Sequence, residues 1–171
     1  MARRGSMAVA TCPGCGQIGR SVSARTVHAV LLAEVATRIV AVKPRFCRSA
    51  GCGVLYYCAD GRTVGSREAH VHVGIKQADD ASLLCYCLGI TRGDIARDIA
   101  TTGTTAAPER ILATIRSSTC DCEVKNPSGT FCLGDVRKVV DEIRRATRAA
   151  PLDDKGAPTV CQGGEDDGAD K

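Results

Sequence analysis

The spacing of the cysteines is the feature that most constrains what this chain can fold into. Eight of its eleven cysteines form two groups of four. The first group reads Cys12-x2-Cys15 and Cys47-x4-Cys52, and the second reads Cys85-x-Cys87 and Cys122-x9-Cys132. An apolar core does not need thiols at such spacings. A metal ion does, because neighbouring thiolates of one loop reach the same ion and a distant pair completes its coordination. The sequence therefore predicts two metal centres.

The composition gives such centres a structural purpose. The chain has 171 residues, of which only 3% are aromatic, and it contains no tryptophan. This length suits one ordinary domain or two small ones. Small domains with few large apolar side chains bury too little surface to be stable alone, and they rely on metals or covalent links. The cysteines would supply these links.

The compartment decides whether the thiols bind metal or pair as disulfides. Residues 1–10 begin with basic residues but lack the apolar stretch of a signal peptide. The longest apolar segment, Val27–Ala36, is interrupted by His28 and Glu34 and is too short to span a bilayer. We therefore expect a cytoplasmic protein without membrane insertion. In that compartment thiols bind metal or react far more often than they cross-link.

Charge and composition mark the two ends of the chain. We expect residues 1–10 to be a flexible leader and residues 151–171, rich in Gly and Asp, to be a disordered acidic tail. The remaining chain is basic, which is compatible with nucleic acid as a partner. Few aromatic side chains are available to stack on bases, and this argues against such a role.

Periodicity predicts a β-rich module at 11–75. Val54–Tyr57, Arg62–Val64 and His70–Ile75 alternate or carry β-branched residues, so we predict three strands there. Val27–Ala36 has apolar residues at helical spacing and predicts a short helix. The polar segment 76–84 predicts a linker.

Segment 85–150 has helical periodicity instead. Thr91 and Asp94 predict a capped helix start and Gly103 its end, and Pro108 predicts the start of a second helix. From Gly134 onward, apolar residues on one face predict a third helix. The predicted fold class is α+β: a small zinc-ribbon-like β module followed by a helical module that binds the second metal centre.

The first group of cysteines predicts a structural zinc site. Cys12, Cys15, Cys47 and Cys52 would supply all four ligands and leave no position open for a substrate. Iron held by four thiolates, as in rubredoxin, remains an alternative. The loop at Cys12 also has the form of a heavy-metal-associated loop, but the cysteine pair that follows argues against this. His70 and His72 would lie on the same face of a predicted strand. We interpret them as exposed surface residues rather than as a pair of metal ligands. We interpret His28 as packed or solvated.

The second group of cysteines favours an iron–sulfur cluster. Cys85 and Cys87 precede a predicted helix start, and Cys132 introduces the last helix. Helix dipoles and free backbone N–H groups near such positions stabilise thiolates and an anionic cluster. This chemistry suits [2Fe–2S]. Cys120 and Cys122 both qualify as the third ligand by spacing alone, whereas Cys58 and Cys161 have no paired neighbour.

Several motifs together resemble the zinc and iron–sulfur domain at the N-terminus of CopZ copper chaperones. The resemblance runs from Thr11 to Arg148 and is carried by Cys12-Pro-x-Cys15, Phe46-Cys-x4-Cys-x-Val-x-Tyr56, Val73-Gly-Ile-Lys76, Cys85-Tyr-Cys87 and Cys122-x4-Pro-Ser-Gly-x2-Cys132. The second half is also similar to bacterioferritin-associated ferredoxin, a helical [2Fe–2S] module with a shorter spacing between its last two cysteines.

The resemblance implies that the two groups of thiols hold different cofactors. It implies Zn²⁺ at Cys12, Cys15, Cys47 and Cys52 and a [2Fe–2S] cluster at Cys85, Cys87, Cys122 and Cys132. It further implies an electron carrier that reduces copper or another thiophilic metal, with an electron donor or acceptor protein and a separate copper-binding chaperone domain as partners. Enzymatic activity in the narrower sense is not expected, since no catalytic constellation is present.

Two other functions stay open from the sequence. Both groups of cysteines could hold zinc in a module that contacts nucleic acid through the arginine-rich last helix. Alternatively, the chain could act as a Cu(I) metallochaperone through spare thiols, for which Cys58, Cys120 and Cys161 are the candidates.

Overall fold

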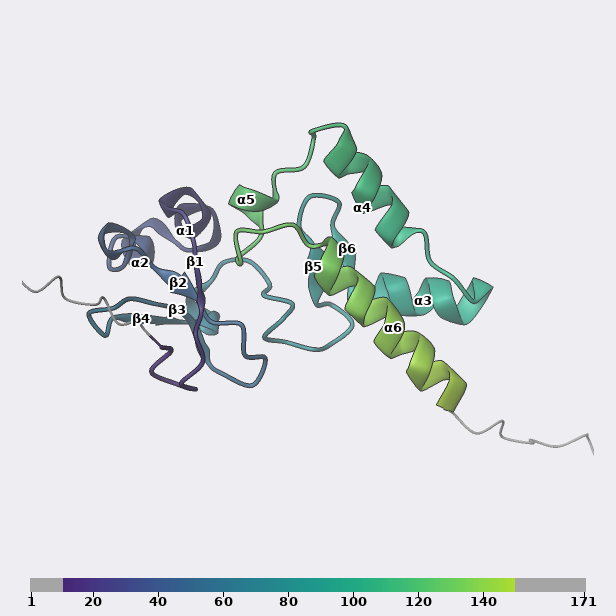
Figure 1. The fold of residues 1–171 in the computed structure, drawn as a ribbon, viewed down its shortest axis with the longest axis horizontal. Coiled ribbons are helices and arrows are strands. Elements are labelled where there is room, and N and C mark those ends of the chain that lie inside the picture. The colour runs from purple at the N-terminus through teal and green to yellow at the C-terminus, as the bar shows by residue number, and fades with distance from the viewer. Residues whose placement is uncertain (1–10, 150–171) are drawn as a thin grey trace, which may run out of the picture.

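A four-stranded antiparallel sheet forms the first half of the fold, and helices form the second half (Figure 1). The structure is a computed structural model that describes residues 11–149. The predicted α+β class is confirmed by this sheet and these helices. The leader at 1–10 and the acidic tail at 151–171 lie outside the described residues.

The sheet has the strand order β1-β2-β3-β4, with every neighbouring pair antiparallel. Its strands are β1 (Arg20–Ser21), β2 (Arg45–Phe46), β3 (Val54–Tyr57) and β4 (Thr63–Gly65). Two short helices, α1 (Ala24–Val30) and α2 (Ala33–Ala36), and the 3₁₀ turn η1 (Val40–Val42) lie between β1 and β2. A second 3₁₀ turn, η2 (Ser66–Glu68), follows β4. The strand predicted at 54–57 is confirmed, and the one predicted at 62–64 lies one residue later.

The interior of this module is built from the sheet and from α1. Phe46 and Tyr56 meet edge to face, with ring centroids 6.0 Å apart, and Val27, Val30 and Leu55 are fully buried beside them. Aromatic pairs in this arrangement stabilise a core beyond the area they bury. Three of the chain's five aromatic residues, Phe46, Tyr56 and Tyr57, are buried in this module.

Two predictions for this module are corrected by the structure. Residues 70–75 form bends and turns rather than a strand, and the preceding residue, Ala69, makes an isolated bridge to Leu31. The same bridge explains why the helix predicted over Val27–Ala36 is broken, because Leu31 and Leu32 take extended backbone angles between α1 and α2. Tertiary pairing overrides local periodicity at both places.

The second module begins with a hairpin and continues as helices. The hairpin consists of β5 (Leu83–Cys85) and β6 (Ile90–Thr91), and α3 (Arg92–Thr102) and α4 (Ala107–Arg116) follow it. A short helix α5 (Cys122–Lys125) precedes the long α6 (Leu133–Ala149). The capped start at Thr91 and the end at Gly103, whose φ is 75°, are confirmed, as are the second and third helices.

Helices α3 and α4 both pack against α6, and the apolar side chains they bury include Ile95, Ile111 and Val136. No helix within residues 11–149 has the length and apolar character needed to cross a membrane.

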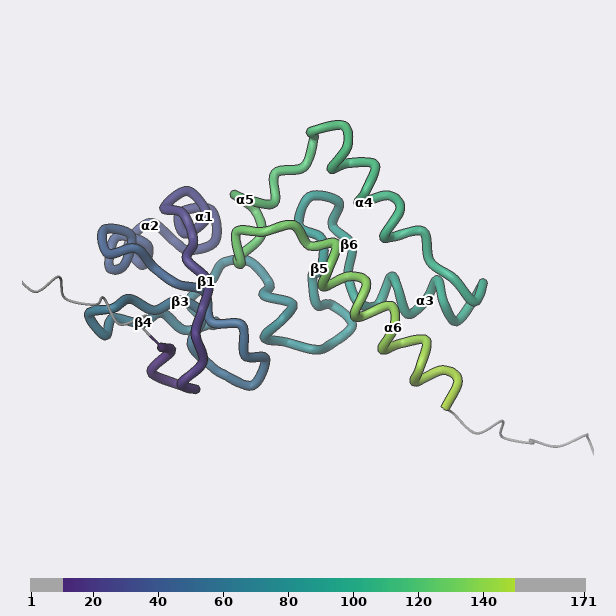
Figure 2. The backbone as a smooth tube through the Cα atoms, in the orientation of Figure 1, coloured from purple at the N-terminus to yellow at the C-terminus, as the bar shows by residue number. Residues whose placement is uncertain are grey.

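The two modules are joined at α5. After α4 the backbone returns to the first module, forms α5 beside α1, and then leads away into α6 (Figure 2). The Thr26 hydroxyl donates to the Glu123 carbonyl at 2.6 Å, and the Tyr56 hydroxyl donates to the Pro127 carbonyl at 2.8 Å. The segment that contains Cys122 and leads to Cys132 is therefore held by the core of the first module.

Candidate metal centres

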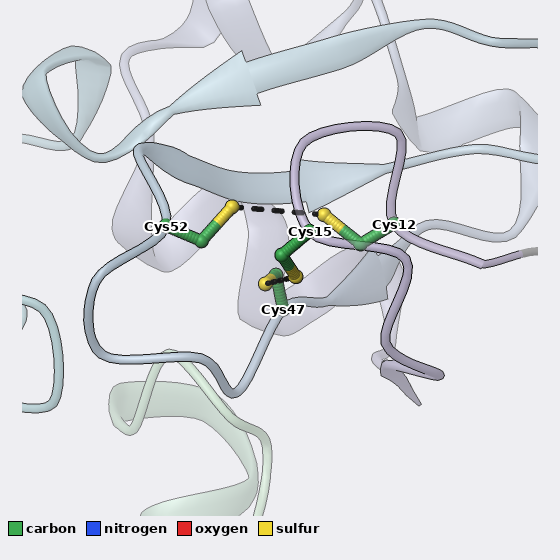
Figure 3. A group of neighbouring side chains, drawn as sticks. All are labelled: Cys12, Cys15, Cys47 and Cys52. Carbon is green, nitrogen blue, oxygen red and sulfur yellow. Dashed lines mark hydrogen bonds between the residues drawn. The ribbon is translucent and has the colours of Figure 1, made fainter.

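The first four predicted ligands are brought together at one end of the sheet. Cys12 and Cys15 lie on the loop before β1, Cys47 directly follows β2, and Cys52 precedes β3. Their sulfurs point toward one another (Figure 3) and all lie within 4.8 Å of each other. The Sγ–Sγ distance is 3.8 Å for Cys12 and Cys52 and 3.6 Å for Cys15 and Cys47.

These distances fit one tetrahedral ion. Zinc–thiolate bonds of about 2.3 Å place the sulfurs of a regular tetrahedron about 3.8 Å apart. Cys12, Cys47 and Cys52 are buried, and Tyr57 and Val54 pack against the group. The four thiols thus have the number, spacing and enclosure that a structural Zn²⁺ site requires.

Backbone hydrogen bonds and small residues shape the loop that carries Cys12 and Cys15. The Cys12 carbonyl accepts hydrogen bonds from the N–H groups of Cys15 and Gly16, and Gly16 has a φ of 71°, which favours glycine. Gly14 is equally constrained, because a Cβ there would lie 3.0 Å from the Cys52 sulfur. The small residues between Cys12 and Gln17 therefore let the loop close around the sulfurs.

The thiols of this group differ in acidity without a metal. Burial raises the pKa of Cys12 to about 12, and burial also raises the pKa of Cys47. A hydrogen bond with the Ser49 side chain lowers the pKa of Cys15 to about 6. At neutral pH some ligands keep their protons until a metal ion displaces them, so metal binding releases protons.

Lys76 supports the second loop, a role that the sequence did not indicate when 76–84 was interpreted as a linker. Its ammonium group donates to the Ser49 carbonyl at 2.6 Å and lies 6.0 Å from the centre of the Phe46 ring. Its charge also lowers the pKa of Cys47, although less than burial raises it. Lys76 thus holds the loop that carries Cys47 and places a positive charge near the thiolates.

The second group contains five sulfurs rather than the predicted four. The Sγ of Cys122 lies 3.8 Å from that of Cys87, 3.1 Å from that of Cys120 and 4.0 Å from that of Cys132. Cys87 and Cys120 are 3.9 Å apart. Cys85 interacts with Cys132 at the far end of the group. Cys87, Cys120 and Cys122 thus lie within 4.8 Å of one another, whereas Cys132 joins the group through Cys122 and Cys85 joins it through Cys132.

Separate segments of the second module contribute sulfurs to this group. Cys85 ends β5, Cys87 lies in the β5–β6 turn and Cys122 begins α5. Cys132 directly precedes α6, and its backbone carbonyl accepts from the Val136 N–H. Cys85, Cys122 and Cys132 are almost fully buried in the apolar core, whereas Cys87 and Cys120 are half-buried. The group thus has a dry side and a side near solvent.

The sulfurs of the second group also share protons. Interaction with Cys132 lowers the pKa of Cys122 to about 5 and that of Cys85 to about 6. The same interactions raise the pKa of Cys132 itself, and burial raises the pKa of Cys87 to about 12. A soft donor set of this kind suits thiophilic metals and iron–sulfur clusters and offers no site to a hard cation.

The remaining predicted donors lie elsewhere. Within residues 11–149, both groups of side chains that could hold a metal consist of cysteines alone. The strand that would have aligned His70 with His72 is absent, and His72 instead lies 3.8 Å from Asp79. Cys58 is buried with its sulfur 3.7 Å from the Ile39 carbonyl. Cys161 lies outside the described residues.

Comparison with known proteins supports a zinc site in the first module. Residues 9–70 match the model of the zf_CopZ family, described as a zinc binding domain. This match covers less than half of the chain, and the four clustered thiols that lie within it fit Zn²⁺. No curated protein matches the chain.

The fold extends the likeness beyond this domain. The structure is similar to the X-ray structure of the Archaeoglobus fulgidus CopZ N-terminal domain, with a TM-score of 0.64 and 23% identity. The match covers 76% of this chain and 97% of the other, so it includes much of the second module. At this identity the likeness establishes the fold.

Proposed function

We propose that the protein is an electron carrier with one structural Zn²⁺ ion and one [2Fe–2S] cluster, and that it serves copper or another thiophilic metal. Zinc would be held by Cys12, Cys15, Cys47 and Cys52, and the cluster by Cys85, Cys87, Cys122 and Cys132. The observation that carries the proposal is the second group of sulfurs, which is half enclosed by an apolar core and half near solvent. When bound, the cluster would supply a carrier that takes up one electron and passes it to an oxidised metal ion such as Cu(II).

The chain's own residues would bind and shield such a cluster. Cys85 and Cys132 lie on the buried side, where the apolar side chains of α3, α4 and α6 exclude water. The Asp121 N–H donates to the Cys87 sulfur at 3.3 Å, and hydrogen bonds to ligand sulfurs raise the potential of a cluster. The half-buried Cys87 marks the edge at which an electron partner could approach.

Metal analysis of protein purified without oxygen tests this proposal. We expect about two irons, two acid-labile sulfides and one zinc per chain, with a visible spectrum and a paramagnetic signal on reduction. Cys132→Ala should remove the iron and keep the zinc, whereas Cys47→Ala should destabilise the zinc site. Cys58→Ala is the matched control, because it removes a buried thiol that belongs to neither group. An iron-free wild-type protein with two zinc ions would reject the electron carrier.

A Cu(I) chaperone is the second candidate function, favoured by one observation. The sulfurs of Cys87, Cys120 and Cys122 all lie within 4.8 Å of one another, an arrangement that could bind a single soft ion through three thiolates. Of the spare thiols considered from the sequence, Cys120 alone lies beside other thiols among the described residues. Titration of the cluster-free protein with Cu(I) tests this function. Cu(I) binding that is unchanged in the Cys120→Ala variant would rule out this chaperone function.

A further inference from the structure

The Cys120 sulfur lies closer to that of Cys122 than the sulfur of Cys87 or Cys132 does. Its sulfur is 3.1 Å from that of Cys122 and 3.9 Å from that of Cys87, and it is half-buried beside them. Cys132, by contrast, contacts Cys122 and Cys85. Cys120 therefore occupies the Cys87 side of the group, next to the position that Cys122 would fill as a ligand.

The backbone explains why Cys120 and Cys122 both reach Cys87. The Asp121 N–H donates to the Cys87 sulfur and fixes the residue between the two cysteines against that thiol. Cys122 then enters α5, where the Asn126 N–H donates to its carbonyl. These contacts hold the Cys120-Asp-Cys122 segment across Cys87.

The turn that ends α4 delivers Cys120 to this place. The N–H of Ser118 donates to the Ile115 carbonyl and that of Thr119 to the Thr114 carbonyl, and Ser118 has a φ of 55°. A left-handed serine is uncommon and needs surrounding contacts to maintain it. Because this backbone leads directly into Cys120, the position of its thiol follows from the fold and not from a free loop.

We propose that Cys120 is an alternate ligand, so that Cys85, Cys87 and Cys132 hold the cluster together with either Cys122 or Cys120. This inference rests on the proposed [2Fe–2S] cluster. The exchange is a ligand substitution without redox change: one iron–sulfur bond breaks as another forms, and the proton of the incoming thiol passes to the outgoing thiolate. The two sulfurs are so close that movement of two side chains suffices, while three ligands stay in place.

Alanine variants that leave equal numbers of thiols test the proposal. Cys122→Ala and Cys132→Ala each leave four thiols in the group, but only the first leaves Cys120 beside the vacated position. We expect Cys122→Ala to keep most of the iron with a shifted visible circular dichroism spectrum and shifted paramagnetic signal. We expect Cys132→Ala and the double variant Cys120→Ala/Cys122→Ala to lose it. Zinc content and far-ultraviolet circular dichroism report whether each variant folds.

Alkylation of the wild-type holoprotein gives a second measurement that needs no variant. With two ligand sets, peptide mapping after limited alkylation should find partial modification at both Cys120 and Cys122. Modification of Cys120 alone, or a Cys122→Ala protein as poor in iron as Cys132→Ala, would overturn the alternate ligand while leaving the cluster intact. If the wild-type protein itself binds no iron, the proposed function fails first, and the two failures are thereby distinguished.

Discussion

Gly74 shows at the scale of one residue how tightly the two modules are joined. It is buried where segment 73–76 passes β5, and its N–H donates to the Tyr86 hydroxyl at 3.3 Å. That hydroxyl in turn donates to the His72 carbonyl at 3.0 Å. A Cβ at Gly74 would lie 2.2 Å from the Leu83 carbonyl oxygen, so no side chain fits without movement of the backbone. Tyr86 lies between two proposed cluster ligands, and its position depends on this close approach.

Gly74→Ala should therefore destabilise the protein by about 1–3 kcal/mol, the usual cost of forcing extra atoms into a packed interior. Denaturant unfolding of the metal-loaded protein measures this change. Gly51→Ala is the matched control, because a Cβ there meets no atom within 4 Å and its φ lies outside the left-handed region. Equal midpoints for the two variants would show that the approach to Leu83 is not a constraint.

At the scale of elements, α3 shows how a helix start is fixed by its own residues. The Thr91 hydroxyl accepts from the Asp94 N–H at 3.1 Å, and the Asp94 carboxylate accepts from the Thr91 N–H at 3.0 Å. Hydrogen bonds from the Thr91 backbone and hydroxyl hold the pKa of Asp94 below its usual value. Because the pKa is lowered on folding, the carboxylate stabilises the protein above its unfolded pKa of about 4, and this contribution is lost as the pH falls through the folded pKa.

Asp94→Ala should cost about 1 kcal/mol at neutral pH, the typical value for loss of a cap. The difference from the wild-type protein should shrink as the pH falls from about 4, the pKa of the unfolded state, toward the lower pKa at which Asp94 of the folded protein becomes protonated. Unfolding free energies measured across this pH range check the prediction. Asp141→Ala on the exposed face of α6 serves as control. A stability difference that stays constant with pH would mean that the charge of Asp94 is irrelevant.

A structural element could be predicted where its signals are local in the sequence, and it could not where it depends on a distant partner. The bounds of α3 follow from Thr91, Asp94 and Gly103, whose signals are local, and β3 follows from its own β-branched and aromatic residues. The strand predicted at 70–75 was wrong because a strand needs a partner, and the bridge to Leu31 is made by the preceding residue, Ala69. Strands β1 and β2 have two residues each, too few for any periodicity.

The candidate site, too, could be predicted only in part from the sequence. Spacing alone grouped the four thiols that meet at the sheet, because close pairs in sequence are necessarily close in space. Spacing could not decide how near Cys120 lies to Cys87, since more than thirty residues, including α3 and α4, separate the two cysteines. Nor could it find Lys76, whose role depends on a contact with the carbonyl of Ser49. Contacts between distant loops are set by tertiary packing, which leaves no mark on local sequence.

At the scale of the whole molecule, the two modules differ in where their thiols lie relative to the apolar core. In the first module one of the buried clusters consists of Cys12, Cys47, Cys52 and Tyr57, so proposed metal ligands are themselves part of the interior. In the second module the sulfurs of the cluster lie among isoleucine and valine side chains from α3, α4 and α6. A thiol cluster without its metal holds protons or repelling charges, whereas packed aliphatic side chains keep their contacts.

Removal of zinc should therefore unfold the first module while leaving α3 and α6 largely helical. The loop with Cys12 is joined to the sheet through the sulfur group, the hydrogen bond from the Gly19 N–H to the Tyr57 hydroxyl, and hydrogen bonds from the Arg45 guanidinium to the Gly19 carbonyl. Structural zinc sites contribute about 10 kcal/mol or more to folding, which is comparable to the whole net stability of a typical domain.

Hydrogen exchange followed by mass spectrometry checks this prediction after a strong zinc chelator is added. Peptides that cover β2 and β3 should lose protection, and those that cover α3 and α6 should keep most of theirs. The α1–α5 junction is the informative region between them, because Thr26 donates to Glu123 across it. Its protection should fall with that of the sheet, since Thr26 belongs to the module that zinc holds together. Loss of protection that spreads equally to α6 would show that the two modules unfold as one cooperative unit.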